Sequence, residues 1–253
     1  MPVGAQRALQ HGADLSGPAG DHVFHGENVH PRLNAFNSFP FPSFRRPSPH
    51  LPSDPPAIHG AVDTHRPAPA DLALLRDAFN AGTDGADALG WAAVHAFEAE
   101  HGVVLPEPYR TFVAEIADGS PTGPPGHGLV ALAALPSDWD GDPAERNLAR
   151  PFPLTAGWVW EDDEETPEEE LDARVGEVHH HGSIVLGTDG CGMYWHLVVT
   201  GPHRGRVWCV TDVGATPFDA GPGRTAATTA TASGFAGWVA HWHAGRPWFD
   251  ADA

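Results

Sequence analysis

Residues 182–213 read GSIVLGTDGCGMYWHLVVTGPHRGRVWCVTDV, and this stretch decides the fold. Three apolar runs rich in β-branched and aromatic residues lie at Ser183–Leu186, Met193–Val199 and Arg206–Val210, and clusters of turn-forming residues separate them. Short apolar runs bounded by such clusters are typical of β-strands, and short connections between them favour antiparallel pairing. The stretch therefore predicts a three-stranded antiparallel meander.

Upstream of the meander, apolar residues recur at steps of three and four, which is the spacing of a helix that buries one face. We expect three helices, over residues 71–79, 87–101 and 105–117. Gly102 supplies a left-handed stop for the second helix, and Pro106 takes the first position of the third, where no amide partner is needed. The second and third helices then form a hairpin whose apolar faces meet in a common core.

The remaining elements lie between and after these segments. Residues 129–135 and 152–160 predict two further strands, and residues 216–233, built mainly of Thr, Ala, Gly and Pro, predict a linker. A last helix is expected from Phe235 to Gly245. Helices followed by an antiparallel sheet and another helix predict an α+β fold.

The first 70 residues differ in composition from the rest of the chain. They are rich in Pro, His, Gly and Ser, as in FPFPSFRRP at residues 39–47. Prolines at this density remove backbone donors and bias their neighbours toward extended conformations. We therefore expect a disordered segment over residues 1–70 and a single domain over residues 71–253. The alternative is that translation begins downstream of Met1 and that part of this segment is never made.

Charge and cysteine content limit the possible partners and compartments. The chain has a formal charge of −19, whereas residues 1–70 carry equal numbers of Arg and acidic residues, so the acidic excess belongs to the rest. Direct binding of nucleic acid needs clustered basic residues and is not expected. Two cysteines, no signal-peptide pattern and no apolar run of membrane-spanning length favour a cytoplasmic protein that does not enter a membrane.

Two short sequence motifs, one after the other in the chain, resemble those of a known family. The first is Leu-Pro-x-x-Tyr-Arg-x-Phe followed by Asp-Gly, and the second is the Asp-Gly-x-Gly turn inside the meander. With an aromatic C-terminal helix behind them, they resemble the SUKH superfamily, or Smi/Knr domain, over roughly residues 88–248. The motif residues, for which we expect structural roles, are Leu105, Pro106, Tyr109, Arg110, Phe112, Gly119, Asp189, Gly190 and Gly192.

The resemblance implies a fold and a class of function. It implies a helical hairpin packed on a curved antiparallel sheet, no shared catalytic residues and no cofactor. It also implies a binding role, because bacterial members resemble immunity proteins that neutralise polymorphic or contact-dependent toxins. A basic toxin domain is therefore the expected partner. The alternative is a regulatory or scaffold adaptor of the Smi/Knr type, with the proline-rich segment as its interaction arm.

Two groups of residues raise enzymatic or metal-binding alternatives. Cys191 and His196 lie close in sequence, and a thiol with an imidazole is used in nucleophilic catalysis. Cys191 sits between glycines in a turn, however, and His196 is expected on a half-exposed strand, so a Cys-dependent hydrolase is the least favoured function. The run His179–His181 and the spaced histidines His22, His25 and His30 suggest metal ligands, but consecutive strand or loop histidines point apart. We expect neither a catalytic site nor a metal site.

The expected partner-binding surface combines aromatic and acidic side chains. Trp158-Val159-Trp160 runs directly into Glu161–Glu170, the densest charge run of the chain, which predicts a mobile loop or the first turn of a short exposed helix. Aromatics beside carboxylates offer an anchor and steer a basic partner. The alternative is that one tryptophan faces the core and the acidic loop is merely solvated. The predicted binding residues are Trp158, Trp160, Glu161, Asp162, Asp163, Glu164 and Glu165.

Overall fold

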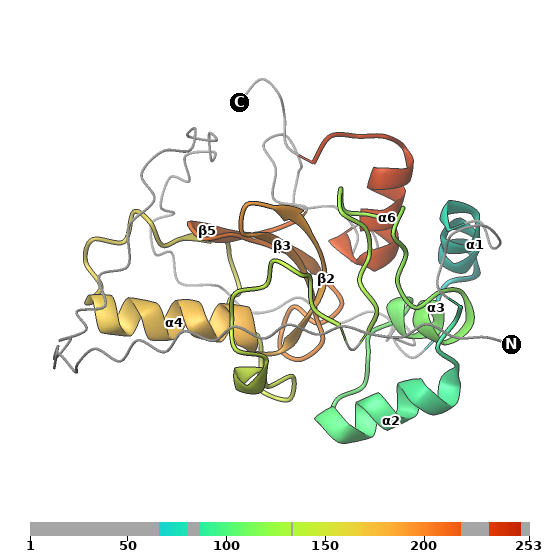
Figure 1. Ribbon diagram of the computed structural model, residues 1–253, viewed down its shortest axis with the longest axis horizontal. Coiled ribbons are helices and arrows are strands. Elements are labelled where there is room, and N and C mark those ends of the chain that lie inside the picture. The colour runs from blue at the N-terminus through green and yellow to red at the C-terminus, as the bar shows by residue number, and fades with distance from the viewer. Residues whose placement is uncertain (1–65, 80–86, 133, 219–232, 249–253) are drawn as a thin grey trace, which may run out of the picture. The chain divides into compact units, whose positions relative to one another are not determined.

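A five-stranded antiparallel sheet with helices around it makes up the described part of the chain (Figure 1). The computed structural model describes residues 66–79, 87–132, 134–218 and 233–248, all of which belong to one compact unit. The predicted α+β fold is confirmed. Most of the segment predicted to be disordered lies outside the described residues, and its last two positions, Pro69 and Ala70, already belong to the first helix.

The three predicted N-terminal helices are present with shifted starts. Helix α1 spans Pro69–Ala78 and begins two residues before the predicted start at residue 71, because proline suits the first turn of a helix. Helix α2 spans Trp91–His101 and ends at Gly102, whose φ of 65° confirms the predicted left-handed stop. Helix α3 spans Tyr109–Glu115. It begins four residues after the start of the predicted range 105–117, and Pro106 lies before it, not at its first position as predicted. A residue that precedes a proline disfavours the helical conformation, and Pro108 places this restriction on Glu107.

The meander is confirmed and is extended by two more strands. Strands β2 (Ser183–Gly190), β3 (Met193–Val198) and β4 (Val207–Val210) pair in sequence order. Strand β5 (Gly214–Pro217) pairs with β4, and β1 (Trp158–Val159) pairs with β5, which gives the order β1-β5-β4-β3-β2. Half of β5 lies in the predicted linker, since its small residues and proline carry no strand signal of their own.

Two further strand predictions were wrong over most of their length. In the stretch 129–135, the pairing of the described residues with other segments through backbone hydrogen bonds is limited to an isolated bridge between Leu129 and Ser120 and a bond from the amide of Val130 to Leu186 O. In the stretch 152–160, only the two residues of β1 are strand. Both stretches are apolar because they pack over the sheet, and periodicity alone does not separate such segments from paired strands.

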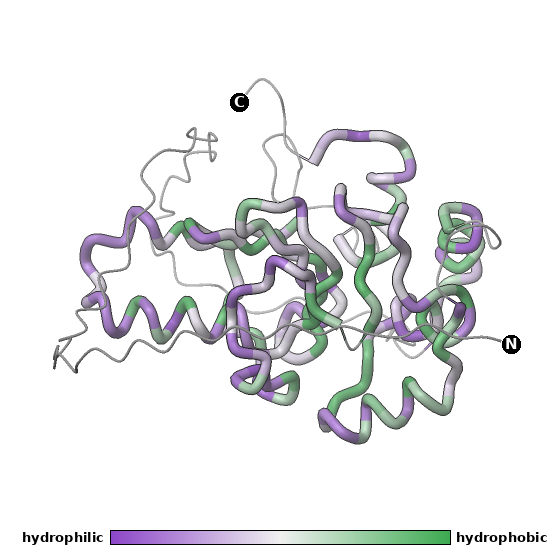
Figure 2. The backbone as a smooth tube through the Cα atoms, viewed as in Figure 1, coloured by the Kyte–Doolittle hydropathy of each residue, from purple (hydrophilic) through white to green (hydrophobic). Residues whose placement is uncertain are grey.

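The acidic run leads into a long helix. Helix α4 spans Glu168–His180, and its first turn holds Glu168–Glu170, where carboxylates interact favourably with the helix dipole. Leu171, Val175 and Val178 pack on the sheet side, and Figure 2 shows the resulting alternation of hydrophobic and hydrophilic residues along α4. A short 3₁₀ turn, η1, spans Pro143–Glu145, and the predicted last helix, α6, spans Phe235–His243.

Both faces of the sheet are buried. Trp195 and Leu197 face the core formed with α1, α2, α3 and α6, and Val198 and Trp208 face a second core beneath α4. The side chains of β3 therefore alternate between the two cores. His196 was expected to be half-exposed but is fully buried, because α4 and the loop around Trp139 cover its face of the sheet.

Candidate functional site

The helical hairpin is fixed by one buried carboxylate. Glu98 on α2 accepts hydrogen bonds from the amide of Leu105 at 2.9 Å and from Arg110 Nε and Nη2 at 2.7 and 2.8 Å. Burial alone would raise the pKa of Glu98, but the bonds from Arg110 and Leu105 lower it overall. Two motif residues thus bind the same carboxylate, and α2 is held against α3. Nearby, Tyr109 and Phe112 lie in the main core, and Pro106 is buried.

The two Asp-Gly phrases join loops to the sheet. Asp189 accepts hydrogen bonds from the amide of Gly126 at 2.7 Å and from Trp195 Nε1 at 2.8 Å. Gly190 and Gly192 around it have φ values of 82° and 73°, in the left-handed region that favours glycine. Gly119 has a φ of 88°, and a Cβ there would lie 2.9 Å from the backbone nitrogen of Ala131. The motif glycines therefore occupy positions where the backbone has a positive φ, which other residues rarely adopt.

The two tryptophans of the predicted binding surface lie in different environments. Trp160 is buried, and its indole N–H donates to the carbonyl of Asp212 at 2.6 Å. Trp158 is half-buried, with the guanidinium of Arg174 4.4 Å from its ring centroid. The rings pack edge to face, 5.3 Å apart. Trp160 thus lies in the core and packs against Trp158. Of the two rings, a partner could contact that of Trp158.

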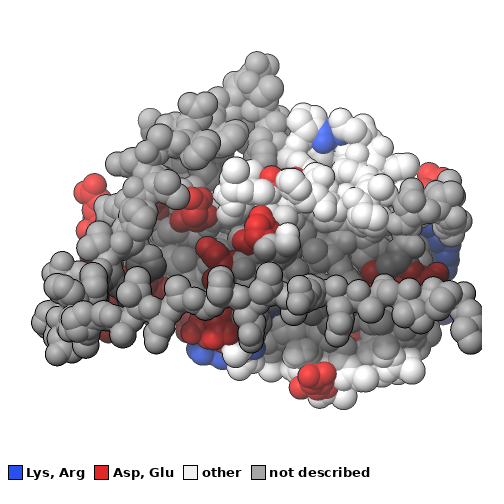
Figure 3. All heavy atoms as spheres, in the orientation of Figure 1, with Lys and Arg blue, Asp and Glu red and all other residues white. Residues whose placement is uncertain are grey.

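Beside Trp158, the acidic run lies on the surface. Glu161, Asp162, Glu164 and Glu165 are exposed, and we call these residues with Trp158 and Asp163 the acidic edge. Asp163 is half-buried, and a hydrogen bond with Thr166 holds its pKa below the usual range. The face drawn in Figure 3 carries several groups of acidic side chains and few basic ones.

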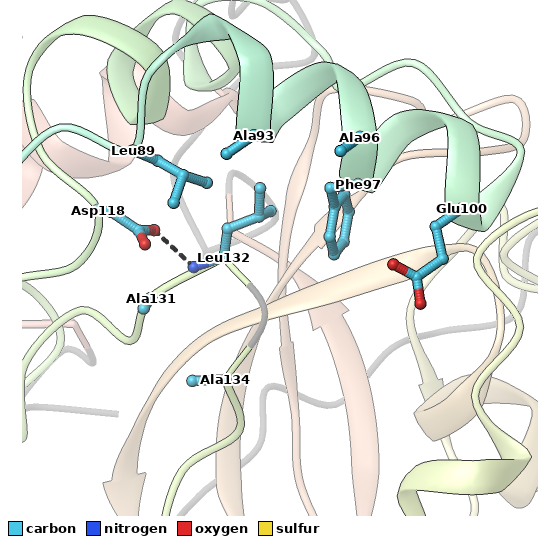
Figure 4. Close-up of a pocket in the computed structure, with 9 residues that line it drawn as sticks. All are labelled: Leu89, Ala93, Ala96, Phe97, Glu100, Asp118, Ala131, Leu132 and Ala134. Atoms are coloured by element: carbon cyan, nitrogen blue, oxygen red, sulfur yellow. Dashed lines mark hydrogen bonds between the residues drawn. The ribbon is translucent and has the colours of Figure 1, made fainter.

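A second surface feature is an apolar hollow beside α2, which sequence reasoning missed. It measures about 490 Å³ and lies between α2 and the segment around Leu132 (Figure 4). The amide of Leu132 donates to Asp118 at 2.8 Å, which fixes this wall. We call the hollow the α2 groove. Its lining residues are Leu89, Ala93, Ala96, Phe97, Glu100, Asp118, Ala131, Leu132 and Ala134.

The comparison with protein families decides the identity of this fold. The model of the SMI1/KNR4 family (SUKH-1) matches residues 92–241, which is more than half of the chain. The chain belongs to the SMI1/KNR4 family. The match runs from α2 into α6 and includes the hairpin, the meander and both Asp-Gly phrases, so the resemblance seen in the sequence is confirmed. Comparisons with curated proteins and with solved structures gave no match.

In this SMI1/KNR4 domain, the two residues that suggested nucleophilic catalysis differ in burial, since His196 is buried and Cys191 is exposed. His196 is fully buried, and its Nδ1 lies 2.9 Å from Ser183 Oγ, which is equally enclosed. Burial holds the pKa of His196 well below its ordinary value. Cys191 is exposed in the turn after β2, whereas Cys209 is buried and its thiol has a pKa raised to about 12. Neither cysteine has a hydrogen bond to His196 among the described residues.

The histidine run lies in and just after the last turn of α4, not in the strand or loop that was expected. His179 and His180 face Trp139, and His180 Nδ1 lies 3.4 Å from Glu145. Within the four described ranges, no group of three or more His, Cys, Asp or Glu side chains is placed to hold a metal ion. The three N-terminal histidines lie outside those ranges. In the same part of the chain, no helix is long and apolar enough to span a membrane.

Proposed function

We propose that this protein is a non-enzymatic, cytoplasmic protein-binding domain that acts as an immunity protein, binding a cognate toxin and blocking it stoichiometrically. The partner is a basic toxin domain and not a nucleic acid. Membership of the SMI1/KNR4 family supports a binding role. The observation that carries the choice of a basic partner is the acidic edge, where exposed carboxylates adjoin the half-buried ring of Trp158.

The acidic edge combines a fixed ring with solvated charge. Trp160 is packed beneath Trp158 and is tied to the loop at Asp212, so the position of the outer ring is set before a partner arrives. Little conformational entropy is then lost on binding. The carboxylates from Glu161 to Glu165 raise the rate of encounter with a basic surface, and salt screens this effect over about 8 Å at physiological ionic strength.

Neutralising the acidic edge tests the proposal. The full chain is co-expressed with the toxin encoded beside its gene, and growth rescue and complex formation are measured. Wild-type protein should protect and form a one-to-one complex. The triple variant Glu161→Gln, Asp162→Asn and Glu164→Gln should associate more slowly and lose its salt dependence.

A matched control makes the same change in charge elsewhere. It replaces three exposed aspartates, Asp77, Asp87 and Asp140, with Asn and should behave like wild type. If the wild-type chain neither protects nor forms a complex, the immunity function is wrong. If both triple variants slow association equally, the function stands and the acidic edge is not the binding surface.

A further inference from the structure

Helix α2 is rich in alanine and is packed on one side only. Its sequence is WAAVHAFEAEH, and Val94 is its only fully buried apolar side chain. Ala92, Ala96 and Ala99 are exposed and Phe97 is half-buried. The helix packs on α3 and lies at the margin of the described fold (Figure 1). The outer face of α2 therefore combines the exposed polar residues His95 and Glu100 with small apolar side chains, and these alanines leave apolar surface uncovered.

The most exposed large apolar side chains of the described residues lie at the two ends of this helix. Leu89, 36% exposed, precedes α2, and Val104, 51% exposed, follows it. Leu89 also lines the α2 groove, where it lies near Leu132 (Figure 4). Leu89 therefore adds exposed apolar surface at the hollow itself, and apolar surface beside a hollow is typical of an interaction site.

The groove is held in shape from both walls. The carboxylate of Glu98 binds α3 and fixes α2, and Asp118 fixes the opposite wall through the amide of Leu132. The small side chains Ala93 and Ala96 line the α2 wall. Alanine at these positions lets another helix approach closely, toward the short end of the 8–10 Å range of helix packing. The groove is thus preorganised for an elongated apolar segment.

Charge selects the occupant. Glu100 and Asp118 line the groove, and no Arg does. Glu100 is exposed and makes no hydrogen bond or ion pair with any described residue. A second copy of this chain, which carries a formal charge of −19, would bring acidic side chains against acidic side chains. A segment with Lys or Arg beside its apolar residues would pair with this rim.

We propose that the α2 groove docks an amphipathic helix of a second protein, whose apolar stripe is flanked by Lys or Arg. This surface is separate from the acidic edge, because the residues that line the groove and those of the acidic edge do not overlap. The inference goes beyond the immunity function: the protein would hold two partners, or two parts of one partner, at once.

A designed peptide tests the docking. The probe is a labelled 16-residue helical peptide with leucines at helical spacing and flanking lysines, and its affinity for the full chain is measured by fluorescence anisotropy. The comparison peptide has the same composition in scrambled order. The patterned peptide should bind at least about tenfold more tightly than the scrambled one, and its binding should shift the amide resonances of residues 89–100 and 131–134.

Two substitutions on one helix provide the matched control. Ala96→Arg should weaken binding of the patterned peptide at least about tenfold, because the long side chain occupies the groove and its charge can pair with Glu100, one helical turn away, in place of a lysine of the peptide. Ala92→Arg changes an exposed alanine of the same helix that does not line the groove and should leave binding unchanged. Thermal melts of both variants check that the fold is kept.

Several results would overturn the docking proposal. These are equal binding of the two peptides, equal effects of Ala96→Arg and Ala92→Arg, or resonance shifts confined to the acidic edge. Self-association that Ala96→Arg abolishes would replace the partner helix with a second copy of the chain. Neutralising Glu161, Asp162 and Glu164 should leave peptide binding intact, so failure of the groove and failure of the immunity function remain distinguishable.

Discussion

Replacing Glu98 with Gln is expected to lower the free energy of unfolding by about 2 kcal/mol. The carboxylate accepts three hydrogen bonds, one from the amide of Leu105 and two from Arg110. A neutral amide in the same place offers one acceptor oxygen, and its NH₂ group would face the donors of the guanidinium. The substitution keeps the volume of the side chain, so the change in stability reports the lost charge and acceptor and not a cavity.

The magnitude follows from the burial of the pair. A hydrogen bond to a charged group contributes about 1.5–3 kcal/mol, and two such bonds are weakened. The side chain of Glu98 is 8% exposed and that of Arg110 is 24% exposed, so the guanidinium recovers part of its hydration when the carboxylate is lost. We therefore expect less than the roughly 3–5 kcal/mol that is typical of breaking a fully buried ion pair.

Urea denaturation at pH 7 measures the effect as a lower midpoint with an unchanged slope. Glu115→Gln is the control, because that carboxylate is 42% exposed and binds Arg76 and Trp91 at the surface. It should change the free energy by less than about 0.5 kcal/mol. If Glu98→Gln is as mild as Glu115→Gln, the buried carboxylate does not hold the hairpin together and the reasoning fails.

Three further predictions concern the sheet and its covering layers. Burial lowers the pKa of His196, so the unfolded state binds more protons than the folded state below about pH 6.5. The free energy of unfolding, measured in urea titrations, should therefore fall from pH 7 to pH 5 by up to about 1.4 kcal/mol per pH unit. A flat profile would contradict this. A Cβ at Gly187 would overlap Pro125 and lie 2.6 Å from a backbone oxygen, so Gly187→Ala should lower the temperature of the unfolding midpoint. On helix α4, a Cβ at Gly176 would meet open space, so Gly176→Ala should raise this temperature slightly. Changes of the same sign in both variants would contradict the close packing at Gly187. Trp160→Phe should lower the free energy of unfolding by about 1–2 kcal/mol, because the indole N–H bond to a backbone carbonyl is lost, and an unchanged urea midpoint would show that this bond contributes nothing.

Local signals predicted the elements that were confirmed. The meander combines apolar runs with glycine turns, the end of α2 is a glycine in the left-handed conformation, and the last helix carries one aromatic face. Each of these signals acts within a few residues. The family was also accessible from the sequence, since its motif residues stand in short phrases, and two of them, Leu105 and Arg110, bind the nearby carboxylate of Glu98.

The predicted binding residues show where local reasoning ended. The run Trp158-Val159-Trp160 indicated an aromatic anchor, but nothing in it separates the buried ring from the half-buried one. The pairing of β1 with β5 and the bond of Trp160 to Asp212 decide that difference. The α2 groove had one signal in the sequence, the alanine-rich composition of α2, but Leu132 in its opposite wall lies more than 30 residues from the end of that helix.

The sequence by itself determined the strands of the meander, the α+β class and the family, because turns, periodicity and short motifs are written within local windows. The tertiary structure decided which side chains are buried and which surfaces remain open. Both faces of the sheet are covered, which encloses His196 and leaves the acidic edge and α2 outside. Burial depends on segments that are distant in the chain. When both faces of a sheet are covered, the hydrophobic pattern of one strand does not show which segments cover it.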